Sequence, residues 1–214
     1  MQATRILAIR HGETAWNVDT RIQDHLDIPL NDTGLQQARW LAQALAERDA
    51  VHAIYASDLA RAHVTALTIG QAMDLPVQTH HGLRERAFGD FQGRTFAEIE
   101  TELPEAAHHW RKRTPEWAPP GAGESLIALR ERVLRTVDEL AARHLGEQIV
   151  LVAHGGVMDV LYRAATRLEL QAPRTWQLPN TAVNRLLWTS EGLSLVGWAD
   201  TTHLDGRSRD ETTA

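Results

Sequence analysis

The sequence lacks cysteine altogether and contains no long apolar run. Without thiols the chain can form no disulfide framework, no cysteine-ligated zinc or iron–sulfur site and no cysteine nucleophile, and a reducing compartment suits it best. No stretch approaches the roughly 20 apolar residues that a membrane-spanning helix needs. We therefore expect a cytoplasmic protein with no membrane partner.

Lysine is almost absent, and basic residues as a whole are outnumbered. Lysine plus arginine is 22 against 28 aspartate plus glutamate, which gives a formal net charge of −6. The longest basic run is Arg111-Lys112-Arg113, and Lys112 is the only lysine of the chain. General nucleic-acid binding needs a larger basic patch, so we expect no nucleic-acid partner.

The 214 residues have the balance of one folded domain, because 43% are hydrophobic and 23% are charged. No internal repeat, low-complexity tract or Ser/Pro/Gly-rich linker divides the chain. We expect a single domain over residues 1–214, with a lid at about 88–123 where glycines and tryptophans interrupt the regular patterns. The sequence leaves the oligomeric state open, with a homodimer as one option.

Short apolar runs alternate with helical patterns along the chain. The runs typical of buried strands are Arg5–Ile9, Ala53–Ala56, Val77–His80 and Ile149–Val152. Two later runs, Ala182–Trp188 and Leu193–Trp198, predict a hairpin that extends the sheet. Strands that alternate with helices predict an α/β fold, a three-layer α/β/α arrangement with a mostly parallel central sheet.

Capping residues mark where the intervening helices start. Asn31–Thr33 offer N-cap side chains to a helix that runs to about Arg48. Ser57 is expected to cap the second helix, and Ser125 a long third helix. Gly155-Gly156 then opens a helix after the last buried strand.

Polar residues of unusual type follow the carboxyl ends of these expected strands. Arg10 and His11 follow the first strand, Arg61 lies in the second helix, Glu85 follows the third strand and His154 follows the fourth. Open α/β sheets bind ligands at this edge. Arginines match phosphoryl oxygens and a neutral imidazole can attack phosphorus, so the pattern indicates a phosphate site with a nucleophile and a proton donor.

The segments that carry these residues resemble a known family. RHGETAWN (10–17) is similar to the signature of the histidine phosphatase superfamily, the phosphoglycerate mutase-like proteins. The resemblance continues in order through RIQDHLDIPLNDTGLQQA, SDLARAHVTA, LRERAFGDFQG, GAGES and VAHGGV, to about residue 160, and His203-Leu204 also fits. A lone RHG would be weak evidence, but ordered blocks over most of the chain make chance similarity improbable.

This resemblance implies a nucleophile and a proton donor. His11 would take the phosphoryl group as a phosphohistidine, and Glu85 would protonate the leaving alkoxide and later accept a proton from water. Physical chemistry adds that His11 must be neutral, with its other ring N–H donated to an acceptor such as a carbonyl near Gly12. Nearby arginines favour that neutral ring.

The resemblance also implies the residues that bind the phosphoryl group. Arg10, Arg61 and His154 would bind its oxygens and belong to the catalytic set, and Asn17 would add a hydrogen bond. Gln23 is a further candidate from the loop that approaches the phosphate.

One position departs from the family pattern, because Asp24 stands where the family often has glycine. A carboxylate that pointed inward would repel phosphate. The backbone N–H of Asp24 could still contact phosphate if its side chain turned outward, so Asp24 is left out of the expected site.

Three activities are compatible with these residues. Cofactor-dependent mutases of the family that the sequence resembles usually carry a longer insertion between the Glu block and the later His block, whereas the path from Gly93 to the GAGES block is compact here. The resemblance therefore implies a metal-independent phosphomonoesterase, a phosphatase-type member that acts on a small phosphate ester without a cofactor. The alternatives are a 2,3-bisphosphoglycerate-dependent phosphoglycerate mutase and a phosphate-binding module without turnover. The pairs His80-His81 and His108-His109 lack metal-ligand spacing, so no metal site is expected.

Overall fold

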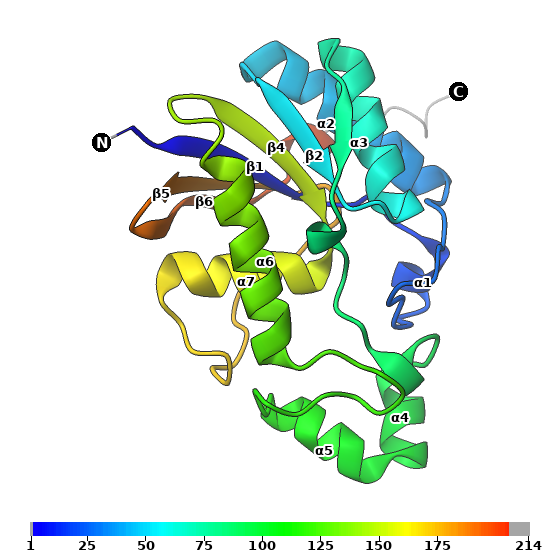
Figure 1. Cartoon of the computed structure of the whole chain (residues 1–214). Helices are drawn as coiled ribbons and strands as arrows, with labels where there is room; N and C mark the ends of the chain where they lie inside the picture. Colours follow the sequence, from blue (N-terminus) through cyan, green and yellow to red (C-terminus); the bar gives the residue numbers. More distant parts are fainter. Residues whose placement is uncertain (1, 206–214) are drawn as a thin grey trace.

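A six-stranded sheet in the order β3-β2-β4-β1-β5-β6 forms the centre of the fold (Figure 1). The computed structural model describes residues 2–205, so residue 1 and residues 206–214 of the expected domain lie outside the described residues. The strands are β1 (Thr4–Arg10), β2 (Ala53–Ala56), β3 (Val77–Thr79), β4 (Gln148–Ala153), β5 (Val183–Thr189) and β6 (Gly192–Asp200).

Strands β1 to β4 run parallel to one another. Strand β5 is antiparallel to β1, and β6 returns antiparallel to β5, so the late strands extend the sheet through a hairpin, as the sequence predicts. Arg10 at the end of β1 is level with Ala153 at the end of β4. The next residue, His11, donates its backbone N–H to the carbonyl of Ala153 over 3.0 Å. The register therefore places His11 and His154 side by side at the carboxyl edge of the sheet.

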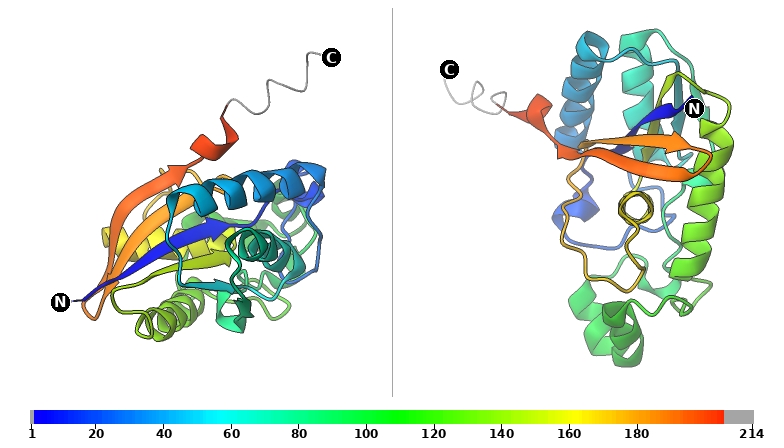
Figure 2. Two further views of the ribbon diagram at one scale, coloured as in Figure 1. Left: turned by 90° about the horizontal axis from the view of Figure 1, so that it is seen from above. Right: turned by 90° about the vertical axis from the view of Figure 1, so that its left-hand side faces the viewer.

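Helices cover both faces of the sheet. Helices α2 (Asp32–Arg48) and α3 (Ala60–Met73) lie on one face, and α6 (Leu126–Ala141) and α7 (Gly155–Thr166) on the other. The remaining α-helices are α1 (Ala15–Val18), α4 (Phe96–Glu102) and α5 (Pro104–Lys112). Leu7 and Ile9 of β1 pack with α2 and α3, whereas Ile6 and Ala8 pack with α6 and α7. Figure 2 shows α2 and α6 on opposite sides of the sheet. The predicted three-layer α/β/α fold is confirmed.

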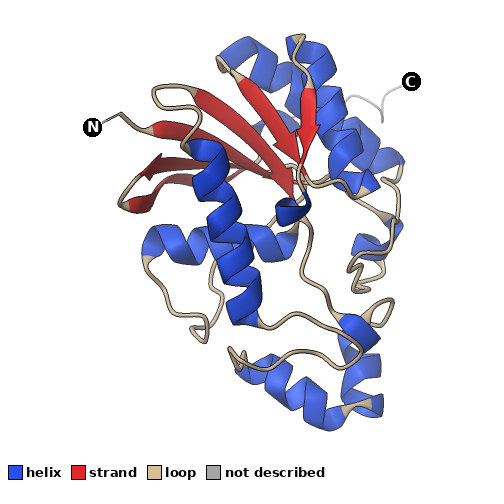
Figure 3. Ribbon diagram, in the orientation of Figure 1, coloured by secondary structure: helices blue, strands red, loops and turns tan. Residues whose placement is uncertain are grey.

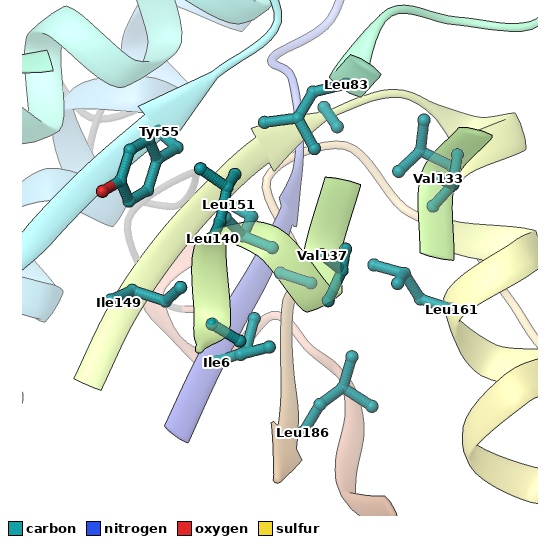
Figure 4. Close-up of a cluster of buried hydrophobic side chains, with 14 of the residues drawn as sticks. Ile6, Tyr55, Leu83, Val133, Val137, Leu140, Ile149, Leu151, Leu161 and Leu186 are labelled. Carbon is teal, nitrogen blue, oxygen red and sulfur yellow. The ribbon is translucent and has the colours of Figure 1, made fainter. Parts of the chain in front are cut away.

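The long helix α6 anchors one of these layers. Its buried stripe contains Leu129, Val133, Val137 and Leu140, which pack against β4 (Figure 4). Burying side chains of this size contributes roughly 1.5 to 3 kcal/mol each. Ser125 caps the helix by accepting the N–H of Ala128 over 3.1 Å, as expected.

The expected cap at Ser57 is wrong. Helix α3 begins at Ala60, and its N-cap Leu59 makes no side-chain cap hydrogen bond. The carboxylate of Asp27 instead accepts the N–H of Ala60 over 2.6 Å, while the Ser57 hydroxyl accepts the N–H of Leu59 over 3.3 Å. A residue more than 30 positions away therefore caps this helix, and a local pattern gives no sign of that.

The segment 88–123 contains two helices that the sequence analysis did not anticipate, α4 and α5. Thr95 and Glu98 form a capping box at the start of α4, and Pro104 begins α5. The two helices extend beyond the sheet on the side toward which the parallel strands point (Figure 3). They share a small apolar cluster of their own, built from Phe91, Ile99 and Ala107 with Phe88, Trp110 and Trp117 packed around it.

Candidate active site

The imidazole of His11 is held in one tautomer at the end of β1. It is 3% exposed, and its Nδ1 lies 2.7 Å from the carbonyl oxygen of Gly12. A carbonyl only accepts, so Nδ1 carries the proton and Nε2 retains its lone pair. Burial, followed by the charges of Arg10 and Arg61, lowers the pKa of His11 well below its usual 6.5, although the Gly12 hydrogen bond opposes this shift. The ring is therefore neutral at pH 7, with an unprotonated Nε2.

Gly12 makes this turn possible. A Cβ at this position would lie 2.5 Å from the carbonyl oxygen of Gly34 at the start of α2, closer than real Cβ contacts allow. The backbone N–H of Gly12 donates to Thr65 Oγ1 of α3 over 3.1 Å. The turn after β1 is thus wedged between two helices, which fixes the carbonyl that orients His11.

Two arginines extend into the same place, and each retains one unpaired donor. Arg61 donates through Nη1 to the Leu26 carbonyl (2.8 Å) and through Nη2 to the Asp24 carbonyl (2.7 Å). Arg10 donates through Nη1 to the Leu178 carbonyl over 2.5 Å. The Nε atoms of both arginines are buried without a hydrogen-bond partner. Burial lowers the pKa of both guanidinium groups, which remain charged at neutral pH.

His154 completes this group at the N-terminus of α7. Its side chain is fully buried, its ring centroid lies 5.2 Å from that of His11, and neither ring nitrogen has a partner. Burial comes first among the causes that lower its pKa well below 6.5, and the positive charges of Arg61 and Arg10 add to it. Buried polar atoms are rarely left unpaired, so these neighbouring orphan groups mark a position for an oxygen-rich ligand.

Glu85 lies at the rim of this position, fixed by two backbone donors. The N–H of Arg86 donates to Oε1 over 2.7 Å, and the N–H of Gly156 lies 3.0 and 3.1 Å from the two carboxyl oxygens. A Cβ on Gly156 would lie 2.2 Å from Oε1, so this contact requires glycine. A Cβ on Gly155 would lie 3.8 Å from both Arg10 Nε and Glu85 Oε2, so those two groups flank one small space.

The remaining expected residues lie close by. Asn17 accepts through Oδ1 from the backbone N–H of Thr14 over 3.1 Å, which leaves its amide NH₂ to donate. Gln23 is 9% exposed, and its Oε1 is buried without a partner. The structure thus brings all seven expected residues to the carboxyl edge of the sheet.

Asn180 is a site residue that the sequence analysis missed. Its Nδ2 lies 2.8 Å from the carbonyl oxygen of His11 and 3.3 Å from Asn17 Oδ1, so it connects two expected site residues. The only local signal is the turn-forming pair Pro179-Asn180, and that pair says nothing about a contact almost 170 residues away.

Asp24 turns its carboxylate away from the space between Arg10, Arg61 and His154, which is called the phosphate position below. Oδ2 accepts the backbone N–H groups of Phe88 and Gly89 over 2.6 and 3.0 Å. The charge that would have repelled phosphate therefore faces the segment 88–123. The backbone carbonyl of Asp24 faces Arg61, as described above.

Two adjoining cavities open beside Arg10 and Glu85, and both are lined by Gly155 and Arg174. Their volumes are about 570 and 420 Å³. The smaller one, called the distal cavity below, has four arginines and one acid, Asp159, together with aromatic side chains. Its charged and aromatic lining comprises Arg86, Arg111, Arg113, Arg174, Asp159, Phe88, His109, Trp110 and Trp117. Burial lowers the pKa of Arg86 to about 10, so this group is still protonated at neutral pH.

The described residues hold neither a metal-binding cluster nor a membrane-spanning helix. No cluster of three or more histidine, aspartate or glutamate side chains in residues 2–205 could bind a metal ion. None of the helices in that range is long and apolar enough to cross a membrane.

Comparison with known proteins identifies the class to which this site belongs. The family model for the histidine phosphatase superfamily (branch 1) matches residues 6–201. Phosphoglycerate mutase-like protein 4 of Arabidopsis thaliana is 38% identical over 94% of this chain and 86% of its own length. The metal-independent phosphoserine phosphatase of the same plant is 35% identical over 95% and 84%.

A solved structure agrees with these sequences. The mycobacterial glucosyl-3-phosphoglycerate phosphatase superposes with a TM-score of 0.83 at 35% identity, over 94% of this chain and all of its own. The chain belongs to branch 1 of the histidine phosphatase superfamily, and it is a phosphoric monoester hydrolase of that class. The family and the fold predicted from the sequence are thus confirmed.

Proposed function

We propose that the protein hydrolyses a phosphate monoester of a small metabolite through a phosphohistidine at His11 Nε2, without a metal ion. The observation that carries this proposal is the group of unpaired donors on Arg10, Arg61 and His154 around a neutral His11. Preorganised donors of this kind stabilise the charge on the equatorial oxygens in the transition state of phosphoryl transfer.

In the first half-reaction the lone pair of His11 Nε2 attacks phosphorus. The bond from phosphorus to the ester oxygen breaks, and its electron pair moves to the leaving oxygen. Glu85 gives its proton to that oxygen, so the product leaves as an alcohol and the carboxyl becomes a carboxylate. The Nδ1–H bond to the Gly12 carbonyl disperses the positive charge of the phosphorylated ring.

In the second half-reaction a water molecule attacks the phosphohistidine. Glu85 accepts one proton from this water, the phosphorus–nitrogen bond breaks, and its electron pair returns to Nε2. Inorganic phosphate leaves with the new oxygen. The carboxyl is protonated again and the ring is neutral, so both groups are ready for another cycle.

The distal cavity indicates the class of leaving group. Arg113 pairs with Asp159 and Arg111 with Glu100, which leaves the positive charges of Arg86 and Arg174 in the lining. These two charges favour a metabolite with a second anionic group, such as a carboxylate. Phe88 and Trp110, stacked 5.1 Å apart, would pack against its carbon skeleton. Relatives named for phosphoserine and glucosyl-3-phosphoglycerate act on phosphorylated carboxylates, and we extend that class to this chain.

A phosphoglycerate mutase activity is the second candidate, supported by the mutase-like relative. The same phosphohistidine would then be attacked by a substrate hydroxyl in place of water. A comparison of 3-phosphoglycerate with and without 2,3-bisphosphoglycerate separates the two activities. Isomerisation without release of phosphate would identify a mutase, and release of phosphate a phosphatase.

Trapping of the intermediate tests the proposal directly. We expect rapid quenching at alkaline pH with ³²P-labelled phosphoserine to leave label on His11. His11→Ala should remove both label and turnover, because of the two histidines in the site only His11 has its ring oriented by a hydrogen bond to a carbonyl. An exposed histidine, His108→Ala, serves as the control. Activity that resists chelators agrees with the proposal. Label on another residue, or full turnover by the His11 variant, would refute it, and binding without turnover would leave a phosphate-binding module.

A further inference from the structure

Asp24 occupies an anion-binding turn at the start of the segment 88–123. Phe88 has right-handed helical dihedral angles (φ −104°, ψ −3°) and Gly89 has φ +55°. This succession turns two neighbouring backbone N–H groups to the same side and forms a nest that binds anions. The Asp24 carboxylate accepts both N–H groups through one oxygen and is itself 5% exposed.

Neither partner in this contact is replaceable by an ordinary residue. A Cβ on Gly89 would lie 2.1 Å from the carbonyl oxygen of Pro120, so the nest requires glycine there. Asp24 itself has φ +51°, in the left-handed region that glycine, asparagine and aspartate tolerate best. Glycine at position 24 would fit the backbone but would leave the nest without its anion.

The loop around Asp24 contacts Arg61, which lies at the phosphate position, and Glu85, the proposed proton donor. The Asp24 carbonyl accepts from Arg61, and His25 Nε2 lies 2.8 Å from the carbonyl oxygen of Glu85. On the other side of the nest, the Phe88 ring lines the distal cavity. Asp24 therefore connects the loop that orients an arginine of the phosphate position to the wall that would face the leaving group.

We infer that Asp24 is a positioning residue. Its carboxylate acts as an internal anion that holds the backbone of Phe88 and Gly89, and with it the neighbouring Glu85, against the loop around Asp24. This inference rests on the proposed function for the roles of Arg61 and Glu85. It predicts that Asp24 governs how the leaving group is placed and protonated, while the binding of the phosphoryl group itself depends on it little.

Asp24→Gly removes only the carboxylate, because glycine tolerates the positive φ and keeps the backbone carbonyl that accepts from Arg61. We expect kcat/KM for phosphoserine to fall by on the order of 10 to 10², the scale of a displacement of about 1 Å within an active site. The inhibition constant of inorganic phosphate should change less than about threefold. Asp24→Asn keeps an oxygen acceptor for the nest but loses the negative charge, so its activity should lie between those of Asp24→Gly and the wild type.

Chemical rescue gives the sharpest test. Removal of the Asp24 side chain leaves room for an acetate ion, so acetate should raise kcat/KM of Asp24→Gly several-fold and saturably. The matched control is Asp74→Gly, because Asp74 has nearly the same φ (+52°) but is exposed at the far end of α3. Acetate should have no such effect on the wild type or on this control.

The outcomes separate this inference from the proposed function. If the wild type hydrolyses phosphoserine and Asp24→Gly matches it, or acetate gives no rescue, the role of Asp24 is wrong and the proposed function stands. If the wild type hydrolyses no phosphate ester, the proposed function fails. Amide hydrogen exchange then still tests whether the Asp24 carboxylate holds the N–H groups of Phe88 and Gly89. Asp24→Gly should accelerate exchange at these two residues, and acetate should slow their exchange in the variant.

Discussion

The proposed roles at the residue scale depend on how few conformations each reactive side chain is allowed. His11 is restricted to one tautomer by a carbonyl, and Glu85 to one position by two backbone N–H groups. The sequence predicted that these residues meet, because they follow strands whose ends share one edge of the sheet. It did not predict Asn180 or the partner of Asp24, since those contacts join distant segments and have no local pattern.

The contact between Gly156 and Glu85 supplies a prediction at this scale. Gly156→Ala should displace the Glu85 carboxyl and lower kcat for alkyl phosphates by a factor on the order of 10² to 10⁴, which is the usual contribution of a general acid to the rate. p-Nitrophenyl phosphate should lose less, because its leaving group needs little protonation. Gly197→Ala, whose Cβ would make an ordinary 3.9 Å contact, is the control. Equal losses on both substrates would contradict the role of Glu85.

At the scale of elements, the sequence predicts the long helices with a strong apolar periodicity, and it misses the short helices α4 and α5. The stripes of α2, α3 and α6 repeat over 14 to 17 residues, so the sequence was sufficient to place them. Helices α4 and α5 have 7 and 9 residues and bury few side chains, so their periodicity is weak. Their real signals are local, a capping box and a proline at the first helical position.

The capping box of α4 allows a test of the segment 88–123. Thr95→Ala should remove about 1 kcal/mol of local helix stability, because the hydroxyl no longer accepts the N–H of Glu98. We expect faster amide exchange in α4 and a higher KM for phosphoserine, with inhibition by inorganic phosphate unchanged. Thr101→Ala in the same helix is the control, since Thr101 is exposed and contacts only the carbonyl of Ala97. Indistinguishable exchange in the two variants would show that the cap is dispensable.

Considered as a whole, the molecule places two neutral histidines in its interior, and this affects its stability. The pKa of His11 and of His154 lies well below 6.5 in the folded state. The unfolded chain therefore binds more protons than the native protein once the pH falls below about 6.5. The stabilising effect of keeping these rings neutral is complete above that pH and is lost progressively in more acidic solution.

This linkage predicts the pH dependence of unfolding. Between pH 6.5 and 5 the free energy of unfolding should fall by up to about 1.4 kcal/mol per pH unit for each histidine. Urea denaturation of the wild type and of His154→Gln measures the slope, and the variant should show a shallower one. His108→Gln, an exposed histidine of α5, should leave the slope as it is. A wild-type curve that is flat over this range would mean that the buried rings accept protons without cost.

The N-terminus of α7 contributes two groups to the candidate active site. Its cap residue, His154, faces the phosphate position, and the amide of its second residue, Gly156, secures Glu85. The proposed binding of the phosphoryl group and the proposed protonation of the leaving group therefore both depend on the position of α7. A substitution that tilts α7 would therefore impair both proposed steps together.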